Sequence, residues 1–325
     1  MAHVTTNTKA AAHDPRNRRS PVHYHRHLAD KSRPATYAAQ VCAAVRVRRR
    51  QDVGEKNMSR HIVSFSTGLS SALTAERVLK QHPDAYIVFM DTQIEDDDNY
   101  RFMQDCSSRW INRYQPQFVT LSDGRNPFQV FEDVRIIPNT RIAPCTFKLK
   151  IELFAKFVEP GDTIYIGYDY SEVDRCEATT RNWEARGCKV EYPLLWKPIE
   201  HRKYADIVRQ DWGILPPRMY GMGYTHANCG GRCVKQGHGD WIRTLVNFPA
   251  RYSEAEQWEL MMQERLGTDY TISKDRTGGE TKPITLRELR QRYEAKQANT
   301  FDLFLLDTQS ACVKCGVGDF TESEE

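Results

Sequence analysis

A regular alternation of strand-like and helix-like segments begins after Met58 and constrains the fold more than any other feature of the sequence. The strand-like segments are short, rich in β-branched and aromatic residues and poor in charge, which is typical of strands covered on both faces. The helix-like segments carry apolar residues at helical spacing, as between Asp97 and Tyr114. Repeated β-α-β units of this kind predict a parallel sheet with helices on both faces.

Five strands are expected, at 61–66, 85–92, 118–122, 163–168 and 189–195. Helices are expected between them, at 70–81, 97–114, 147–158 and 174–186. Beyond His201 the strand pattern stops, and further helices are expected at 205–210, 239–248, 254–266 and 286–297. We therefore predict an α/β fold, a Rossmann-like doubly wound parallel sheet of about five strands, in residues 58–200. A mostly helical, cysteine-bearing C-terminal region is predicted for residues 201–325.

The first 57 residues differ from the rest of the chain in charge. They hold 12 Lys and Arg against 4 Asp and Glu, whereas residues 58–325 hold 34 basic and 39 acidic residues. This composition predicts a basic, disordered extension, and the alternatives are an arm that binds nucleic acid or a translation start at Met58. No apolar run is long enough to span a membrane and no secretory signal is apparent, so we expect neither a membrane nor a secreted protein.

Nine cysteines in 325 residues, an odd number, favour the reducing cytoplasm over a secreted disulfide framework. Four of them form two tight pairs, Cys229 with Cys233 in a Cys-Gly-Gly-Arg-Cys turn and Cys312 with Cys315 in a Cys-Val-Lys-Cys-Gly turn. Each turn places two sulfurs on one side of the chain. Together the four would complete a tetrahedral shell suited to Zn²⁺ or to an iron–sulfur cluster, and the sequence leaves these two open.

The end of the first strand is the first place to search for a ligand site, because ligands bind at the C-terminal ends of parallel strands. The run Ser-Thr-Gly-Leu-Ser-Ser at 66–71 follows that strand and leads into a helix. Small residues and hydroxyls in such a turn let backbone N–H groups converge on an anion, and the helix N-terminus adds partial positive charge. An ordinary Ser-capped helix without a ligand is the alternative.

This run resembles the PP-loop of the adenine nucleotide α-hydrolase-like superfamily, whose usual form is Ser-Gly-Gly-x-Asp-Ser. Ser66, Gly68 and Ser71 match, while Thr67 stands in place of a glycine and Ser70 in place of the aspartate. Four further segments follow in the order found in the phosphoadenosine phosphosulfate (PAPS) reductase family, which the chain therefore resembles. They lie at 89–92, 143–150 and 167–175, and at 192–196 together with 213–220.

The resemblance implies an enzyme that binds an adenine nucleotide, either ATP or PAPS. The residues implied at the nucleotide are Ser66, Thr67, Gly68, Ser70, Ser71 and Asp91, and those implied at the reacting group are Lys148, Lys150 and Arg175. The cations would neutralise charge that develops at the reacting phosphoryl or sulfuryl group. Plainer alternatives exist: Asp91 could cap its own turn, and Arg175 could pair with Glu172 three residues before it.

Two reactions are compatible with the resemblance. The favoured one is α–β cleavage of ATP with Mg²⁺, which would activate an acceptor, a nucleic acid or a sulfur carrier, for sulfur transfer or nucleic-acid modification. Sulfonucleotide reduction would instead use Cys315 as nucleophile and thioredoxin as partner, since PAPS reductases end in Cys-Gly-Leu/Ile-His, although Gly318 stands in place of that histidine here. A third hypothesis is an inactive nucleic-acid-binding module with structural zinc.

Overall fold

The computed structural model describes residues 59–139, 141–276 and 279–299, and its centre is a five-stranded parallel sheet in the order β3-β2-β1-β4-β5. The strands are β1 (His61–Phe65), β2 (Tyr86–Asp91), β3 (Gln117–Ser122), β4 (Thr163–Tyr165) and β5 (Lys189–Glu191). In the register of the sheet, Ile62 of β1 lies between Tyr86 and Ile164. The strand order reverses between β1 and β4, which makes the C-terminal ends of these two strands a topological switch point.

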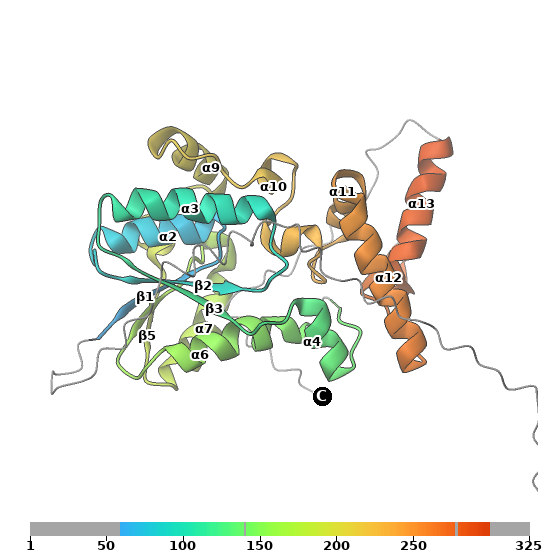
Figure 1. Cartoon of the computed structure of the whole chain (residues 1–325), viewed down its shortest axis with the longest axis horizontal. Coiled ribbons are helices and arrows are strands. Elements are labelled where there is room, and N and C mark those ends of the chain that lie inside the picture. Colours follow the sequence, from blue (N-terminus) through green and yellow to red (C-terminus); the bar gives the residue numbers. More distant parts are fainter. Residues whose placement is uncertain (1–58, 140, 277–278, 300–325) are drawn as a thin grey trace, which may run out of the picture.

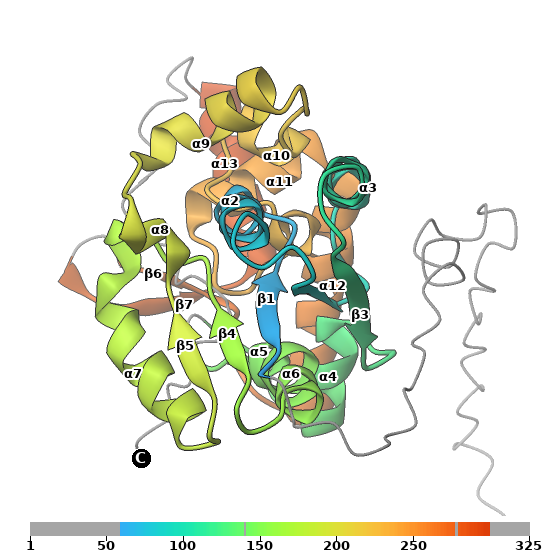
Figure 2. The same cartoon turned by 90° about the vertical axis from the view of Figure 1, so that its left-hand side faces the viewer.

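Helices cover both faces of the sheet (Figure 1). One face carries α2 (Leu69–Leu79) and α3 (Asp97–Ile111), and the other carries α6 (Glu152–Phe157) and α7 (Val173–Glu184), as Figure 2 shows from the side. Neighbouring residues of β1 enter opposite cores: Val63 lies in the core that contains Trp110 of α3, whereas Ile62 lies in the core that contains Trp183 of α7. This two-sided burial explains why the strands are apolar along their whole length.

The predicted α/β fold is confirmed, and all five strands begin within one residue of the predicted positions, although β4 ends at Tyr165 and not at 168. β5 is shorter than predicted because Pro193, which has no N–H for a sheet, begins α8 (Pro193–Trp196). Short elements connect the layers: α4 (Pro127–Val134), α5 (Pro144–Thr146), η1 (Phe147–Ile151), η2 (Tyr170–Glu172) and η3 (His201–Lys203). The sequence did not predict α4, although Asn126 and Gln129 form a reciprocal capping box at its start.

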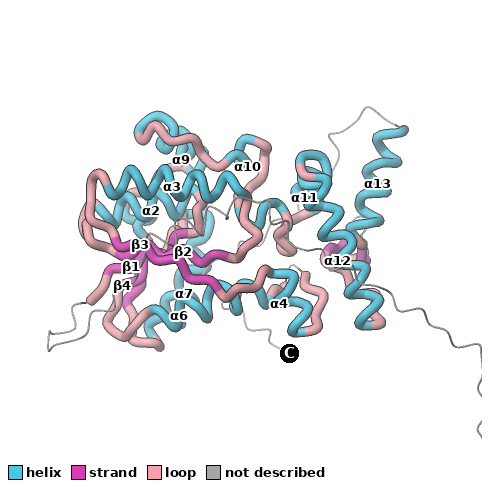
Figure 3. Tube along the Cα trace, viewed as in Figure 1, coloured by secondary structure: helices cyan, strands magenta, loops and turns pink. Residues whose placement is uncertain are grey.

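The C-terminal region is mostly helical, as predicted. Its elements are α9 (Tyr204–Asp206), η4 (Ile207–Asp211), α10 (Arg218–Gly221), η5 (Asn228–Gly231), α11 (His238–Asn247), α12 (Pro249–Leu266) and α13 (Leu286–Asn299). The expectation that strands stop beyond His201 is wrong, because β6 (Ser273–Asp275) and β7 (Lys282–Ile284) form an antiparallel hairpin beside α12 (Figure 3). Strands of three residues are too short to produce a periodic pattern.

One buried carboxyl group attaches this hairpin to α12. Glu259 accepts hydrogen bonds from the backbone N–H groups of Ile272 and Leu286, both at 2.7 Å. Burial raises the pKa of Glu259 to about 7, above its ordinary value of 4.5.

Among the described residues, no helix is both long and apolar enough to cross a membrane.

The hydrophobic cores do not divide at residue 200. Tyr204 and Val208 pack into the same core as Phe65, on the α2 and α3 face of the sheet. Conversely, Phe131 of α4, which precedes residue 200, packs in the C-terminal core against Trp258 of α12, with the two ring centroids 5.8 Å apart. Apolar packing therefore crosses the boundary that the sequence predicts, in both directions.

A buried ion-pair cluster also joins the C-terminal region to the sheet. Asp96 is fully buried, caps α3 by accepting from the backbone N–H of Asp98, and binds Arg218 at 2.8 Å and Arg251 at 2.7 Å. Both guanidinium groups also lie over the ring of Phe248. Burial raises the pKa of Asp96, but the hydrogen bonds from the two arginines outweigh it and hold this pKa below the ordinary value of 3.8.

We predict that Asp96→Asn lowers the free energy of unfolding at neutral pH by about 2–3 kcal/mol, because it leaves two partly buried arginines without their carboxylate. Since the pKa of Asp96 is lower in the folded than in the unfolded protein, the cluster stabilises the fold above about pH 4 and is lost as the pH falls through the folded-state pKa. Urea unfolding between pH 3 and 7 measures both effects. Exposed Asp97→Asn is the control, and an equal loss in that variant would contradict the prediction.

Candidate functional site

The loop between β1 and α2 has an unusual backbone. Thr67 is fully buried and adopts a left-handed conformation with a φ of 59°, which glycine accepts far more readily than a β-branched residue. Its hydroxyl donates to the carbonyl of Ser66 at 2.6 Å. The position at which the PP-loop resemblance expects glycine is therefore one where this chain needs glycine-like geometry and reaches it with threonine.

Serine hydroxyls hold this loop closed on itself. Ser71 Oγ accepts from the backbone N–H of Ser66 at 3.1 Å and donates to the carbonyl of Gly68 at 3.0 Å. The N-cap of α2 is Gly68, which has no side chain to cap it, so the alternative of a Ser-capped helix is wrong. The first turn holds no acidic residue, and the N–H groups of Thr67, Gly68 and Ser70 find no acceptor among the described residues. The loop therefore presents unneutralised N–H donors at a helix N-terminus.

Two residues that the sequence analysis did not assign to the site fix the position of the loop. Gly167 follows β4, and a Cβ atom there would lie 3.1 Å from backbone atoms of both Ser70 and Ser71. Tyr220 of α10 places its hydroxyl 3.4 Å from the backbone nitrogen of Leu69. Both lie in segments that carry the family resemblance, and a glycine inside the strand expected at 163–168 is the signal that could have identified Gly167, since such a glycine often marks a close backbone approach.

Asp91 ends β2 and closes its own turn. Its Oδ1 accepts from the backbone N–H of Gln93 at 2.8 Å and from the hydroxyl of Tyr100 at 2.7 Å. Burial, together with the charge of Asp91, raises the pKa of Tyr100, so this hydroxyl stays protonated as the donor. Asp91 Oδ1 therefore caps its own turn, as the alternative interpretation expects. Contact between Asp91 and the nucleotide stays a prediction.

The three cations predicted at the reacting group have different surroundings. Lys148 pairs with Glu152 one turn later in the helix at 3.2 Å. Lys150, two residues on, is buried and lines a separate pocket. Arg175 donates to Glu172 at 2.7 Å, which is the pairing that the spacing suggests, and its guanidinium lies 4.4 Å from the centre of the Tyr168 ring. Their joint action on one phosphate stays a prediction.

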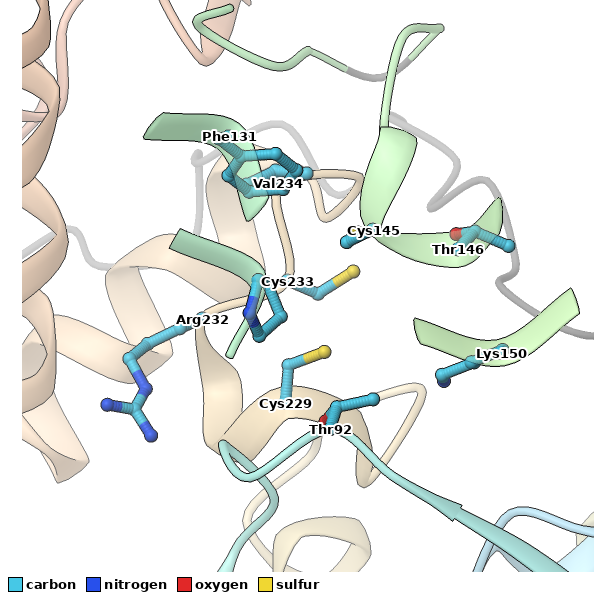
Figure 4. Close-up of a pocket in the computed structure, with 10 residues that line it drawn as sticks. Thr92, Phe131, Cys145, Thr146, Lys150, Cys229, Arg232, Cys233 and Val234 are labelled. Atoms are coloured by element: carbon cyan, nitrogen blue, oxygen red, sulfur yellow. The ribbon is translucent and has the colours of Figure 1, made fainter. Parts of the chain in front are cut away.

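The pocket that Lys150 lines also contains thiols (Figure 4). Cys229 and Cys233 point their sulfur atoms into it from the turn that includes η5, and Cys145 lines it from α5. Cys229 and the two glycines after it all have left-handed backbone conformations, with φ values of 55°, 56° and 80°. This tight turn brings the two thiols of the predicted pair to one pocket, as the sequence predicts, whereas Cys145 was not expected there.

A buried carboxyl group supports the thiol-bearing turn. Glu95 accepts from the backbone N–H of Cys229 at 2.8 Å and from the hydroxyl of Thr92 at 3.0 Å. Burial raises the pKa of Glu95, and the nearby charge of Lys150 acts in the opposite direction. The acidic run at 95–98 is therefore engaged in tertiary contacts, through Glu95 to this turn and through Asp96 to the arginine cluster.

The other predicted ligands are not placed. Cys312 and Cys315 lie outside the described residues, so the four-cysteine site and the nucleophilic role of Cys315 stay predictions. Within 59–139, 141–276 and 279–299, no group of three His, Cys, Asp or Glu side chains is arranged to hold a metal ion. Cys106 and Cys188 are buried, and burial raises the pKa of both thiols, which makes them poor nucleophiles.

No family model matches this chain, and no curated protein matches it. A search of solved structures finds a PAPS reductase from Candida auris, solved as a phosphate complex, with 11% sequence identity and a TM-score of 0.35. The match covers 53% of this chain and 80% of that chain.

We predict that Gly167→Ala lowers the free energy of unfolding by about 1–2 kcal/mol, because the new methyl group meets the backbone of α2 and forces the helix start to shift. Urea unfolding measures this loss. The control is Gly221→Ala in α10, where a Cβ atom meets nothing within 4 Å and the backbone is not left-handed. Equal stability of the two variants would show that α2 does not pack closely on Gly167.

Proposed function

We propose that this protein is a nucleotide-dependent enzyme whose loop at residues 66–71 binds the phosphates of an adenine nucleotide. The reaction that we favour is cleavage of ATP between its α and β phosphates, which activates an acceptor for sulfur transfer or nucleic-acid modification. The observation that carries the proposal is the start of α2, which has no side-chain cap and lies at the switch point of the sheet. The N–H groups of Thr67, Gly68 and Ser70 have no acceptor there among the described residues, and Thr67 has a left-handed backbone.

In this proposal the cations stabilise negative charge on the phosphates and do not transfer protons. Lys148 and Arg175 would turn from their present partners, Glu152 and Glu172, toward the phosphates. Oδ2 of Asp91 would meet the ribose or the adenine edge, since Oδ1 already accepts two hydrogen bonds. Mg²⁺ would arrive with ATP, because this ion is commonly bound by nucleotide phosphates and water with few protein ligands.

Cys229 and Cys233 would supply two ligands of a zinc ion or an iron–sulfur cluster, with Cys312 and Cys315 as the other two. The donor set fits such a group, since thiolates are the usual ligands of both and a fixed turn presents two of them to one pocket. When bound, zinc would stabilise the turn, whereas a cluster would add redox or sulfur chemistry. Cys145 lines the same pocket and is a further thiol within reach of this region.

We predict that Ser70→Glu weakens nucleotide binding without weakening the fold. A carboxylate in the first turn of α2 interacts favourably with the helix dipole but repels a phosphate at the same N-terminus. Isothermal titration with ATP and Mg²⁺, and with PAPS, measures binding, and thermal unfolding measures stability. We expect binding at least about tenfold weaker than in the neutral Ser70→Gln control, with equal or higher stability. Equal ATP affinity in the two variants would place the phosphates elsewhere.

We further predict that anaerobically purified protein contains zinc, or iron with acid-labile sulfide, and that Cys229→Ser loses it. Elemental analysis and sulfide assay distinguish the two kinds of site. Cys188→Ser, which removes a buried thiol near β5, is the matched control and should keep the full content. Comparing Cys145→Ser with Cys312→Ser shows which thiols complete the site, and unchanged metal content in Cys229→Ser would refute the ligand assignment.

A further inference from the structure

A second concave surface lies along α2, away from the phosphate loop. This groove, of about 640 Å³, is bordered by the second halves of α2 and α3, by α8 and by η4, and we call it the α2–α8 groove. α8 and α9 both pack on α2, as Figure 2 shows. The groove's two cations on α2, Arg77 and Lys80, follow Ser70 of the loop by seven and ten residues, about 10 Å and 15 Å along a helix, so they lie apart from the loop.

The groove is basic, although the chain beyond residue 57 carries more acidic than basic residues. The cations that line it are Arg77, Lys80, Arg109, Arg113 and Lys197, and the carboxylates are Glu76 and Asp211. Glu76 is buried and already bound, by Arg109 at 3.3 Å and by the indole N–H of Trp110 at 3.0 Å. Lys80, which is exposed, lies 3.9 Å from the same carboxylate. The exposed part of the groove therefore keeps a surplus of positive charge.

Two tryptophans stand in the wall of the same groove. Trp196 is 43% exposed, which is high for so large an apolar side chain. Arg77 holds the segment that carries it, because its guanidinium donates to the carbonyls of Pro193 and Lys197, both at 2.6 Å. The Trp212 ring is fixed by the guanidinium of Arg109, 5.2 Å from its centre. Both indoles are thus anchored beside cations.

We propose that the α2–α8 groove binds a single-stranded nucleic acid. Bases would stack on Trp196 and Trp212, while Lys80, Arg113 and Lys197 would neutralise the phosphates between them. Aromatic platforms interleaved with cations are the usual means of holding a single strand, and they require bases that are free of a duplex. An acidic peptide would pair with the cations, but its carboxylates do not stack on the indoles. The proposal does not depend on nucleotide binding at the loop.

The test measures binding of a fluorescein-labelled 20-nucleotide oligodeoxythymidine to the full chain by anisotropy, over a range of salt concentrations and without ATP. Lys80→Gln/Arg113→Gln should lower the slope of log affinity against log salt by about 1.4, or about 0.7 for each lost phosphate contact. Trp196→Ala should weaken binding about tenfold with an unchanged slope, since stacking involves no counterions. Trp196→Phe should restore most of the affinity.

The matched control is Arg265→Gln/Lys274→Gln, which removes one arginine and one lysine from exposed positions on α12 and β6. Residues 1–57 are present in every variant, so their contribution to the slope cancels. Absence of binding by the wild type, or groove variants that match the control, would overturn the proposal. The proposal would also be overturned if polyglutamate displaced the oligonucleotide and bound the wild type and Trp196→Ala equally well. The groove would then bind an acidic peptide. Thermal unfolding of each variant confirms that the fold persists.

Discussion

Glu95 and Asp96, two consecutive buried carboxyl groups just before α3, hold the C-terminal region against the sheet. The positions of α10, which carries Tyr220, and of the thiol-bearing turn depend on them. Asp96 binds Arg218 and Arg251, which bring α10 and α12 to the C-terminal edge of the strands. Glu95 binds the backbone of Cys229 and so fixes the thiol-bearing turn. Their pKa values move in opposite directions, because Asp96 has arginine partners that outweigh its burial, whereas burial dominates at Glu95.

α2 connects the separate surfaces of the molecule. Its N-terminus follows the loop at residues 66–71 and packs closely on Gly167, and its second half forms one wall of the basic groove. The same helix is buried against Phe65 and Trp110 along its inner face, so it cannot move toward one surface without disturbing the other. A ligand that shifts the start of α2 therefore acts on a rigid element whose far end borders the groove.

Local patterns in the sequence identify the sheet and the loop, but not the contacts between distant residues. The strands are predictable because burial on both faces makes them uniformly apolar, as in β1 and β2. The loop is predictable from its small and hydroxyl-bearing residues. The partners of Asp96, in contrast, lie 122 and 155 residues away, and Cys145 lies far from Cys229 in sequence. No periodicity encodes such pairings, since tertiary packing alone creates them.

The position of Lys150 illustrates that packing gives a residue surroundings that its motif does not reveal. The family resemblance pairs it with Lys148 at the reacting group, but residues two apart in a helix point in different directions. Lys148 accordingly reaches Glu152 at the surface, whereas Lys150 is buried in the thiol pocket, where its charge opposes that of Glu95. Thiolates at Cys229 and Cys233 would add negative charge beside this carboxyl group. A buried cation is then required for charge balance, and Lys150 is the lysine that lines that pocket.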